Sequence, residues 1–242
     1  FLRLKKFSLK KPLFLSEFGA GSDQRTHTYT PQIFDFSPEY QQKFIKWYLN
    51  FLEKEDSIIG CSIWNLIDFQ VDGRIDTQPC INNKGILTAD RQKKGIFYYI
   101  QARWSNKPMV HIAGSDWTYR VEVCDSSVNN RPVIIYTNQD SVELFLNGKS
   151  LGKLNSQDRE VCFLVPFING NNSLIAKAGS QIDNLNIQME FIPNKLTEYA
   201  NLSKGIYVNT GQDHCYFFDP LTKRMWLPDQ PYKEGSWGYV DG

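Results

Sequence analysis

The sequence lacks several features that would assign it to a common class. It has no apolar run long enough to cross a bilayer, no CxxC pair and a formal net charge of only +1. A charge this small gives no electrostatic attraction toward nucleic acid or an anionic membrane, so we expect no nucleic acid partner and no membrane insertion. The chain begins at Phe1, with neither an initiator methionine nor a signal peptide, and we expect it to be a piece of a longer protein.

Cysteine is present but scattered, and its odd number leaves at least one thiol unpaired. We expect mostly buried free thiols, no metal site and no cofactor. The cysteines are Cys61, Cys80, Cys124, Cys162 and Cys215.

What the chain does have is length and aromatic side chains. Its 242 residues, of which 41% are hydrophobic, suffice for one large domain or for two to three small ones. Aromatic residues reach 14%. Because the C–H face of a sugar packs on a ring while its hydroxyls bond to polar edges, this composition suits a carbohydrate surface.

Two buried parallel strands, each followed by a helix, are predicted in residues 12–104. The first is an apolar run that ends in Ser16-Glu17-Phe18-Gly19, and the second covers 58–64. Ser37-Pro38-Glu39 is typical of a helix start, with an N-cap serine and an N1 proline, and a second helix is expected over 92–104. Two such units are too few to close a barrel.

The first of these helices carries one apolar stripe and is expected to end near Glu55. Residues at this spacing line one side of a helix, so we expect the stripe to face the core rather than a cofactor. Its members are Tyr40, Phe44, Trp47, Tyr48, Phe51 and Leu52.

Polar and aromatic residues follow the ends of both predicted strands. In an α/β barrel the functional side chains lie at the carboxyl ends of the strands, which is where Glu17 stands. A carboxylate there is costly unless it is paired in a salt bridge or used in chemistry, and both alternatives stay open. We expect Glu17 and Trp64 to project to the same side from adjacent parallel strands.

After Pro108 the pattern changes to short strands separated by Gly and Asn turns. It predicts a β-sandwich over residues 107–193, with a type I′ hairpin at Asn147-Gly148. Residues 194–203 are expected to be a linker, and residues 204–242 to open a third unit dense in aromatics. The predicted strands cover 110–112, 119–123, 133–136, 142–146, 149–154, 161–165, 174–178 and 185–191.

Three motifs in combination resemble glycoside hydrolase family 2, the family of β-galactosidases and β-glucuronidases. They are Ser16-Glu17-Phe18-Gly19, then Trp64-Asn65-Leu66-Ile67-Asp68-Phe69, then the stretch from Asn82 to Arg91. The resemblance covers residues 12–106 and implies that residues 1–106 are the C-terminal part of a TIM (β/α)8 barrel, its last two β/α units. It also implies an immunoglobulin-like sandwich over 107–193.

The third unit resembles the beginning of a malectin-like carbohydrate-binding module. The match rests on Trp226-Leu227-Pro228-Asp229-Gln230 and Gly235-Ser236-Trp237-Gly238-Tyr239. The implied fold class is therefore multidomain, α/β followed by all-β.

The family resemblance implies a retaining exo-β-glycosidase, which works by double displacement through a glycosyl-enzyme. Glu17 matches the nucleophile of the family, and Trp64 matches the tryptophan that floors the sugar site. The acid/base of the family is a Glu preceded by Asn, and this sequence contains no such pair. We therefore expect that residue upstream of Phe1, and this fragment alone to be inactive.

The sugar is suggested by Asn82 and Lys84, which match the Asn-x-Lys motif that holds the substrate carboxylate in β-glucuronidases. An ammonium beside an amide makes charge-assisted hydrogen bonds to a carboxylate, so the motif favours β-glucuronidase. Gln78 stands where an arginine is expected in that group, and β-galactosidase remains the alternative. The other alternative is that Lys84 pairs with Asp68 or Asp90 as scaffold.

Five further residues are candidates for sugar contact. Asp23, Arg25 and Asp68 are expected near the substrate, with stabilisation of their own loops as the alternative. Trp237 and Tyr239 are the candidates in the third unit, with a role in its core as the alternative. A competing hypothesis is a non-catalytic carbohydrate-binding fragment.

The expected partner of the protein is a β-linked oligosaccharide or glycoside. The sequence leaves homo-oligomer formation open. A polysaccharide-degrading role implies a periplasmic or secreted protein.

Overall fold

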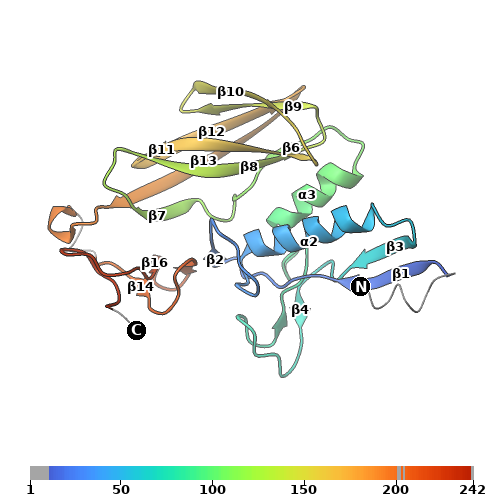
Figure 1. Cartoon of the computed structure of the whole chain (residues 1–242), viewed down its shortest axis with the longest axis horizontal. Coiled ribbons are helices and arrows are strands. Elements are labelled where there is room, and N and C mark those ends of the chain that lie inside the picture. The colour runs from blue at the N-terminus through green and yellow to red at the C-terminus, as the bar shows by residue number, and fades with distance from the viewer. Residues whose placement is uncertain (1–10, 201–202, 204, 241–242) are drawn as a thin grey trace.

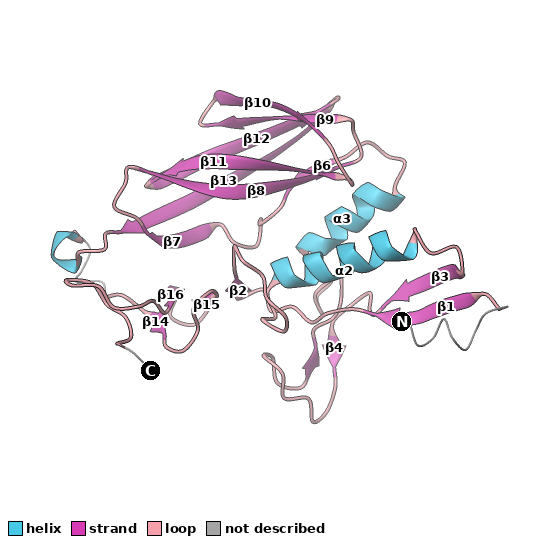
Figure 2. Cartoon of the chain, viewed as in Figure 1, coloured by secondary structure: helices cyan, strands magenta, loops and turns pink. Residues whose placement is uncertain are grey.

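The computed structural model describes residues 11–200, 203 and 205–240, which form three parts (Figures 1 and 2). The first part contains strands β1 (Leu13–Phe18) and β3 (Ile58–Ile63) and helices α2 (Pro38–Leu52) and α3 (Gly95–Trp104). The predicted order of strand, helix, strand and helix is confirmed. Within the described residues, no helix combines the length and the apolar character needed to cross a membrane.

Strands β1 and β3 pair in parallel, with Leu13 opposite Ile58. On the face toward the helices, Phe18 is buried in a hydrophobic cluster with residues of α2 and α3. On the other face Phe14 is 58% exposed and Ile59 is 70% exposed. Within the described residues the helices therefore cover one face of the two strands, and burial of the other face stays a prediction.

Helix α2 begins where the sequence predicts. The hydroxyl of Ser37 accepts a hydrogen bond from the backbone N–H of Tyr40 at 3.0 Å, which satisfies one free donor of the first turn. The buried side of the helix includes Ile45, whereas Trp47 is 61% exposed and stacks on Phe51. The predicted aromatic stripe is thus only partly core, because its rings pack against one another along the flank of the helix.

The second part is a β-sandwich, and each strand predicted for it is present. One sheet has the strand order β10-β9-β12-β13-β7 and the other has the order β11-β8-β6. Asn147 and Gly148 have φ values of 50° and 80°, as the predicted type I′ hairpin requires. The strands are β6 (Val110–Ile112), β7 (Tyr119–Val123), β8 (Val128–Thr137), β9 (Ser141–Leu146), β10 (Lys149–Asn155), β11 (Glu160–Ile168), β12 (Gly170–Ala178) and β13 (Gln181–Ile192).

The third part is a small sheet with the strand order β14-β16-β15-β2. Its own strands are β14 (Val208–Asn209), β15 (Tyr216–Asp219) and β16 (Arg224–Pro228), while β2 (Thr26–His27) comes from the loop after β1. Figure 1 shows β2 beside these C-terminal strands, although β2 and the C-terminal strands are far apart in the sequence. The third part is therefore bonded to the first through a shared sheet.

The segment that precedes the third part is packed rather than free. It contains a 3-10 turn (Leu196–Glu198), and Tyr199 is 8% exposed while its hydroxyl donates to Glu190. Tyr199 buries its ring in a hydrophobic cluster with residues of the second and third parts, and the assignment of 194–203 as a linker stays a prediction. Residues 201 and 202 lie outside the described part.

Aromatic rings join the three parts at one point. Trp117 of the sandwich is 4% exposed and stacks on His27 of β2, with ring centroids 5.0 Å apart and planes at 4°. Its ring also contacts Tyr29 at 4.8 Å and Tyr216 at 5.3 Å. Since such ring pairs contribute about 0.5–1.5 kcal/mol each beyond their buried area, this cluster holds the parts together.

The cysteines are less buried than expected. All five are free thiols within the described residues, yet Cys215 alone is buried, while Cys80 and Cys162 are exposed. Cys162 takes an outward position in the alternation of β11, and Cys80 lies in a loop. The prediction of mostly buried thiols is therefore wrong, because strand register exposes Cys162 and a loop position exposes Cys80.

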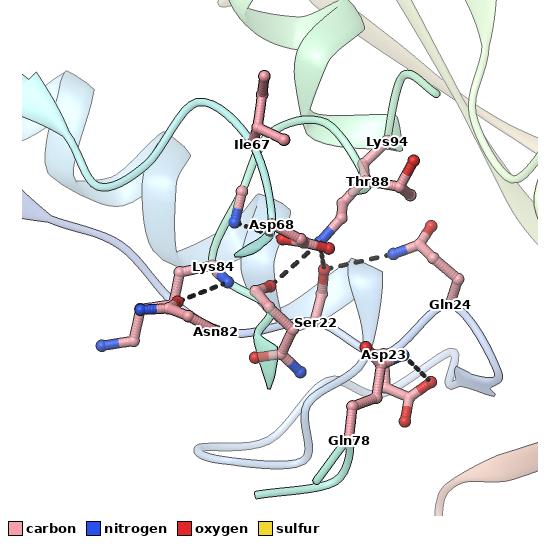
Figure 3. Close-up of polar contacts among 12 residues, drawn as sticks. Ser22, Asp23, Gln24, Ile67, Asp68, Gln78, Asn82, Lys84, Thr88 and Lys94 are labelled. Carbon is pink, nitrogen blue, oxygen red and sulfur yellow. Dashed lines mark hydrogen bonds and ion pairs between the residues drawn. The ribbon is translucent and has the colours of Figure 1, made fainter. Parts of the chain in front are cut away.

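A buried ion pair fixes the loops at the carboxyl ends of β1 and β3. The ammonium of Lys94 lies 2.7 Å from Asp68 Oδ2 and donates to Asn83 O at 3.1 Å and to Ser22 Oγ at 3.4 Å (Figure 3). Asp68 Oδ1 also accepts from the backbone N–H of Gly85 at 2.7 Å. The side chains of Lys94 and Asp68 are 1% and 7% exposed, so each charge is stabilised by the other rather than by water.

Burial affects the two charges in opposite directions. It raises the pKa of Asp68 above the ordinary value, and it lowers the pKa of Lys94 below its ordinary value. Their mutual attraction opposes both shifts. Removing one partner therefore leaves the other as an uncompensated buried charge.

We expect Lys94→Met to lower the free energy of unfolding of this part by about 3–5 kcal/mol, because Asp68 is left buried without its cation. The matched control is Lys54→Met, which removes an exposed lysine and should change stability by less than about 0.5 kcal/mol. Urea unfolding followed by intrinsic fluorescence measures both. The double variant Lys94→Met/Asp68→Leu should recover most of the loss, and a single-variant loss no larger than that of the control contradicts the role of the pair.

Candidate active site

Glu17 and Trp64 stand at the carboxyl ends of β1 and β3, as the sequence predicts. The backbone N–H of Trp64 donates to Phe18 O at 2.8 Å, which joins the two strand ends. A side chain at Gly19 would bring its Cβ to 1.9 Å from Trp64 O, so this close approach needs a glycine. The peptide bond from Trp64 to Asn65 is cis.

Glu17 is exposed within the part of the chain that the structure describes. A register shift between Leu15 and Phe18 interrupts the alternation of β1, so Ser16 and Glu17 are both exposed. Among the described residues, none makes a hydrogen bond or ion pair with the Glu17 carboxylate. The alternative of a salt-bridged Glu17 is therefore not found in this part of the chain.

Backbone hydrogen bonds bring the Asn-x-Lys segment next to Trp64. The strands β4 (Phe69–Gln70) and β5 (Ile81–Asn82) form a short hairpin, and Lys84 follows it. Asn65 N–H donates to Lys84 O at 3.2 Å, and Ile86 N–H donates to Asn65 O at 3.0 Å. Lys84 thus lies beside the residue that follows Trp64.

The side chains of Asn82 and Lys84 both carry hydrogen-bond donors. Asn82 is buried, and its Oδ1 accepts the backbone N–H of Lys84 at 3.2 Å, which leaves its Nδ2 group to donate. The ammonium of Lys84 has no hydrogen-bond or ion-pair partner within the described residues, because Asp68 is taken by Lys94 and Asp90 accepts from Thr88. The scaffold pairing of Lys84 with Asp68 or Asp90 is therefore not observed.

Asp23 and Arg25 bind each other. The guanidinium of Arg25 donates to both carboxylate oxygens of Asp23, at 2.9 and 2.6 Å, and Gln78 Nε2 donates to Oδ1 at 3.2 Å. Burial raises the pKa of Asp23, but the hydrogen bonds from Arg25 outweigh it and leave the pKa below its ordinary value. Arg25 also donates to Thr77 O at 3.1 Å. These contacts fit the alternative in which Asp23 and Arg25 stabilise their own loop rather than contact a sugar.

The residues that hold the loops of the site in place were not predicted from the sequence. Besides Lys94, these include Gln41, whose Nε2 donates to Ala20 O at 2.9 Å and to Gly85 O at 3.1 Å. Ser22 Oγ donates to Gln41 Oε1 at 3.0 Å. The available signal was a glutamine on the buried face of an amphipathic helix, which indicates a polar group with a buried partner.

In the third part the two candidate rings differ. Trp237 packs against the hydrophobic cluster that contains Trp117, and its Nε1 is buried without a hydrogen-bond partner. Tyr239 is 49% exposed. Trp237 thus takes the packing role that was left as the alternative, whereas Tyr239 presents part of its ring to solvent.

The chemistry available at the strand ends follows from these contacts. An exposed carboxylate can attack an electrophilic carbon, a neighbouring indole can pack on a sugar face, and an unpaired ammonium beside an amide donor can hold an anion. All three groups are attached to segments joined by backbone hydrogen bonds.

Comparison with protein families gives two matches. The family described as "Glycosyl hydrolases family 2, TIM barrel domain" matches residues 2–108. A domain of unknown function, DUF4982, matches residues 129–182 of the sandwich.

Among curated proteins, a putative β-glucuronidase of Formosa agariphila is 31% identical over 170 residues, which are 67% of this chain and 20% of that protein. A β-glucuronidase of Bacteroides fragilis is 29% identical over 149 residues, which are 57% of this chain and 20% of that protein. This chain spans about a fifth of the length of these curated relatives.

Solved structures include Bacteroides uniformis β-glucuronidase 2 covalently bound to cyclophellitol-6-carboxylate aziridine. It is 42% identical, has a TM-score of 0.91, and is matched over 100% of this chain and 29% of its own. Together with the match to the barrel domain, this similarity shows that the chain belongs to glycoside hydrolase family 2.

Proposed function

We propose that the protein containing this chain is a retaining exo-β-glycosidase of the β-glucuronidase type. The observation that carries the proposal is the backbone bonding that links the ends of β1 and β3 to the Asn-x-Lys segment. It joins the segments that carry Glu17, Trp64 and Lys84. Among the described residues, neither Glu17 nor Lys84 has a charged partner. A charge without a partner beside an aromatic ring is available to a substrate.

In the proposed reaction Glu17 attacks the anomeric carbon of the terminal sugar and forms a glycosyl-enzyme, while the bond to the leaving oxygen breaks. A second carboxyl group protonates that oxygen and then activates water, and in retaining enzymes it stands roughly 5–5.5 Å from the nucleophile. We assign that group to another segment of the full-length protein. The indole of Trp64 packs on the sugar ring.

The choice of a glucuronide over a galactoside as substrate rests on Lys84 and Asn82. A glucuronate carboxylate accepts from the Lys84 ammonium and from the Asn82 Nδ2 group, whereas a neutral galactose leaves the ammonium without an anion. The relative solved with a cyclophellitol-6-carboxylate aziridine supports this choice. A β-galactosidase remains the alternative within the class.

A non-catalytic carbohydrate-binding fragment is the alternative from another class. The exposed Tyr239 ring fits a sugar surface, but the open Glu17 carboxylate is not needed for binding of this kind. Turnover by the full-length protein separates the two functions.

The finer architecture is part of the proposal. We assign residues 1–106 to the last two β/α units of a (β/α)8 barrel, residues 107–193 to an immunoglobulin-like sandwich and residues 204–242 to the beginning of a malectin-like module. The parallel pairing of β1 with β3 and the two sheets of the sandwich support the first two assignments. An enzyme that degrades polysaccharide needs access to it, so we propose a periplasmic or secreted location.

We expect Glu17→Gln in the full-length enzyme to lower kcat/KM for an aryl β-glucuronide by at least about 1,000-fold, because the amide cannot form the glycosyl-enzyme. The matched control is Asp56→Asn, which removes an exposed carboxylate just before β3, at the opposite end of the strands. Steady-state hydrolysis measures both. Normal turnover by Glu17→Gln would mean that the nucleophile is wrongly assigned.

We expect Lys84→Ala to lower kcat/KM for an aryl β-glucuronide by roughly 30-fold to several thousand-fold, from a loss of about 2–5 kcal/mol. An aryl β-galactoside should lose much less, because its C6 hydroxyl carries no charge. Comparing the two substrates on one variant controls for damage to the fold, and Lys93→Ala controls for the loss of a nearby exposed lysine. Equal losses on both substrates would make Lys84 a scaffold residue.

A further inference from the structure

The junction between the first and third parts brings together a carboxylate, an imidazole and a thiol, which are side chains of metal-ligating types. Strand β15 begins at Tyr216 and pairs with His27 of β2, which places His214 and Cys215 against the loop that precedes α2. The hydroxyl of Thr28 donates to the backbone oxygen of His214 at 2.6 Å and fixes its main chain.

At this junction the donor atoms of Asp35, His214 and Cys215 all lie within 4.8 Å of one another. The side chain of Asp35 is 1% exposed, that of His214 is 14% exposed, and Cys215 is 2% exposed. A carboxylate, an imidazole and a thiol thus converge in a nearly closed space, and they come from segments far apart in the sequence.

The imidazole of His214 is oriented for a ligand. Its Nδ1 lies 2.7 Å from Asp213 Oδ1, so Nδ1–H donates to that carboxylate and Nε2 carries the lone pair. Nε2 is shielded from solvent and has no hydrogen-bond partner within the described residues. A carboxylate behind one ring nitrogen and a free second nitrogen is the usual arrangement of a metal-binding histidine.

The carboxylate of Asp35 is held in place as well. Its Oδ1 accepts from Ser37 N–H and Oγ–H, both at 2.8 Å, and its Oδ2 accepts from Gln32 N–H at 2.7 Å. Oδ2 lies 3.8 Å from Nε2 of His214, which is beyond hydrogen-bond distance. A simple ion pair with protonated His214 would therefore leave a buried N–H without an acceptor, whereas a cation between the two atoms satisfies both.

We propose that Asp35, His214 and Cys215 form a zinc site that fastens the third part to the loop before α2. Thiolate, imidazole and carboxylate are the ligands that zinc takes, and in a tetrahedral site they stand roughly 3.3–3.6 Å apart. Small side-chain rotations close the difference from the observed spacing. Calcium takes six to eight oxygen ligands, so a set with sulfur and nitrogen does not suit it.

Binding exchanges a proton for the metal. The Cys215 S–H bond breaks, the sulfur binds the cation, and the proton leaves to solvent. Zinc binds the thiolate form of cysteine, so formation of the site is coupled to the release of this proton. With three protein ligands, a water molecule completes the coordination.

The sequence gives no local signal for this site, because metal sites are indicated by cysteines and histidines in pairs close along the chain. Cys215 has a histidine beside it, but its third partner, Asp35, precedes helix α2 in the first part. The site is created by the pairing of β15 with β2, which the sequence pattern did not indicate.

Cobalt substitution tests the proposal in the full-length protein. Wild-type protein stripped of metal should take up Co²⁺ and gain a thiolate-to-cobalt charge-transfer band that excess Zn²⁺ abolishes. Cys215→Ser should lose the band, while the matched control Cys80→Ser, which changes an exposed cysteine, should keep it. A wild type without the band, or a band unchanged in Cys215→Ser, overturns the proposal.

A second variant avoids disturbing the buried core. Asp213 is 74% exposed, so Asp213→Ala should fold normally yet bind Zn²⁺ about 10–100-fold more weakly, because the orienting hydrogen bond to His214 is lost. Asp72→Ala, at another exposed aspartate, should leave the affinity unchanged. Competition with a chromophoric chelator measures both dissociation constants. No zinc binding by folded wild type would leave Asp35 and His214 as a plain ion pair. Equal affinity in wild type and Asp213→Ala would mean that the bound zinc does not use His214, and would overturn the proposed ligand set.

Discussion

The buried ion pair of Lys94 and Asp68 is the contact on which the candidate active site depends. It lies beneath the loops that leave β1 and β3, and through Ser22, Asn83 and Gly85 it connects segments from both. Both charges are shielded from water. If either loop moved away, the charge that stayed behind would be buried without its partner, which is strongly unfavourable. Figure 3 shows the ammonium of Lys94 between Asp68 and Ser22, which belong to these two loops.

This pairing also explains why the neighbouring charges differ in role. Asp68 and Lys94 neutralise each other, and so do Asp23 and Arg25, which leaves these four groups to hold loops in place. Lys84 stands close by with a partly exposed ammonium that no described residue pairs with. A site that must bind an anion needs such a cation, because a lysine already paired would exchange one carboxylate for another with little gain.

The three parts of the chain act as one body because aromatic stacking and a shared sheet join them. His27 takes part in both, since its backbone pairs with β15 and its ring stacks on Trp117 of the sandwich. The pKa of His27 is raised: burial lowers it, but the charge of Glu39 and a hydrogen bond to the same carboxylate outweigh the burial. The contact between His27 Nδ1 and Glu39 Oε1, 3.1 Å long, therefore links α2 to the junction.

The sequence by itself determined the local elements and the positions of the candidate residues. The Ser37 cap, the Asn147-Gly148 hairpin, the alternating strands of the sandwich and the place of Glu17 at a strand end all follow from interactions within a few residues. What only the tertiary structure decided was the pairing of distant groups: Lys94 rather than Lys84 with Asp68, the exposure of Trp47, and the meeting of Asp35 with His214 and Cys215. Periodicity tells which residues share a side of an element, but which charge or donor lies opposite depends on how loops are packed across the fold, and no local pattern encodes that.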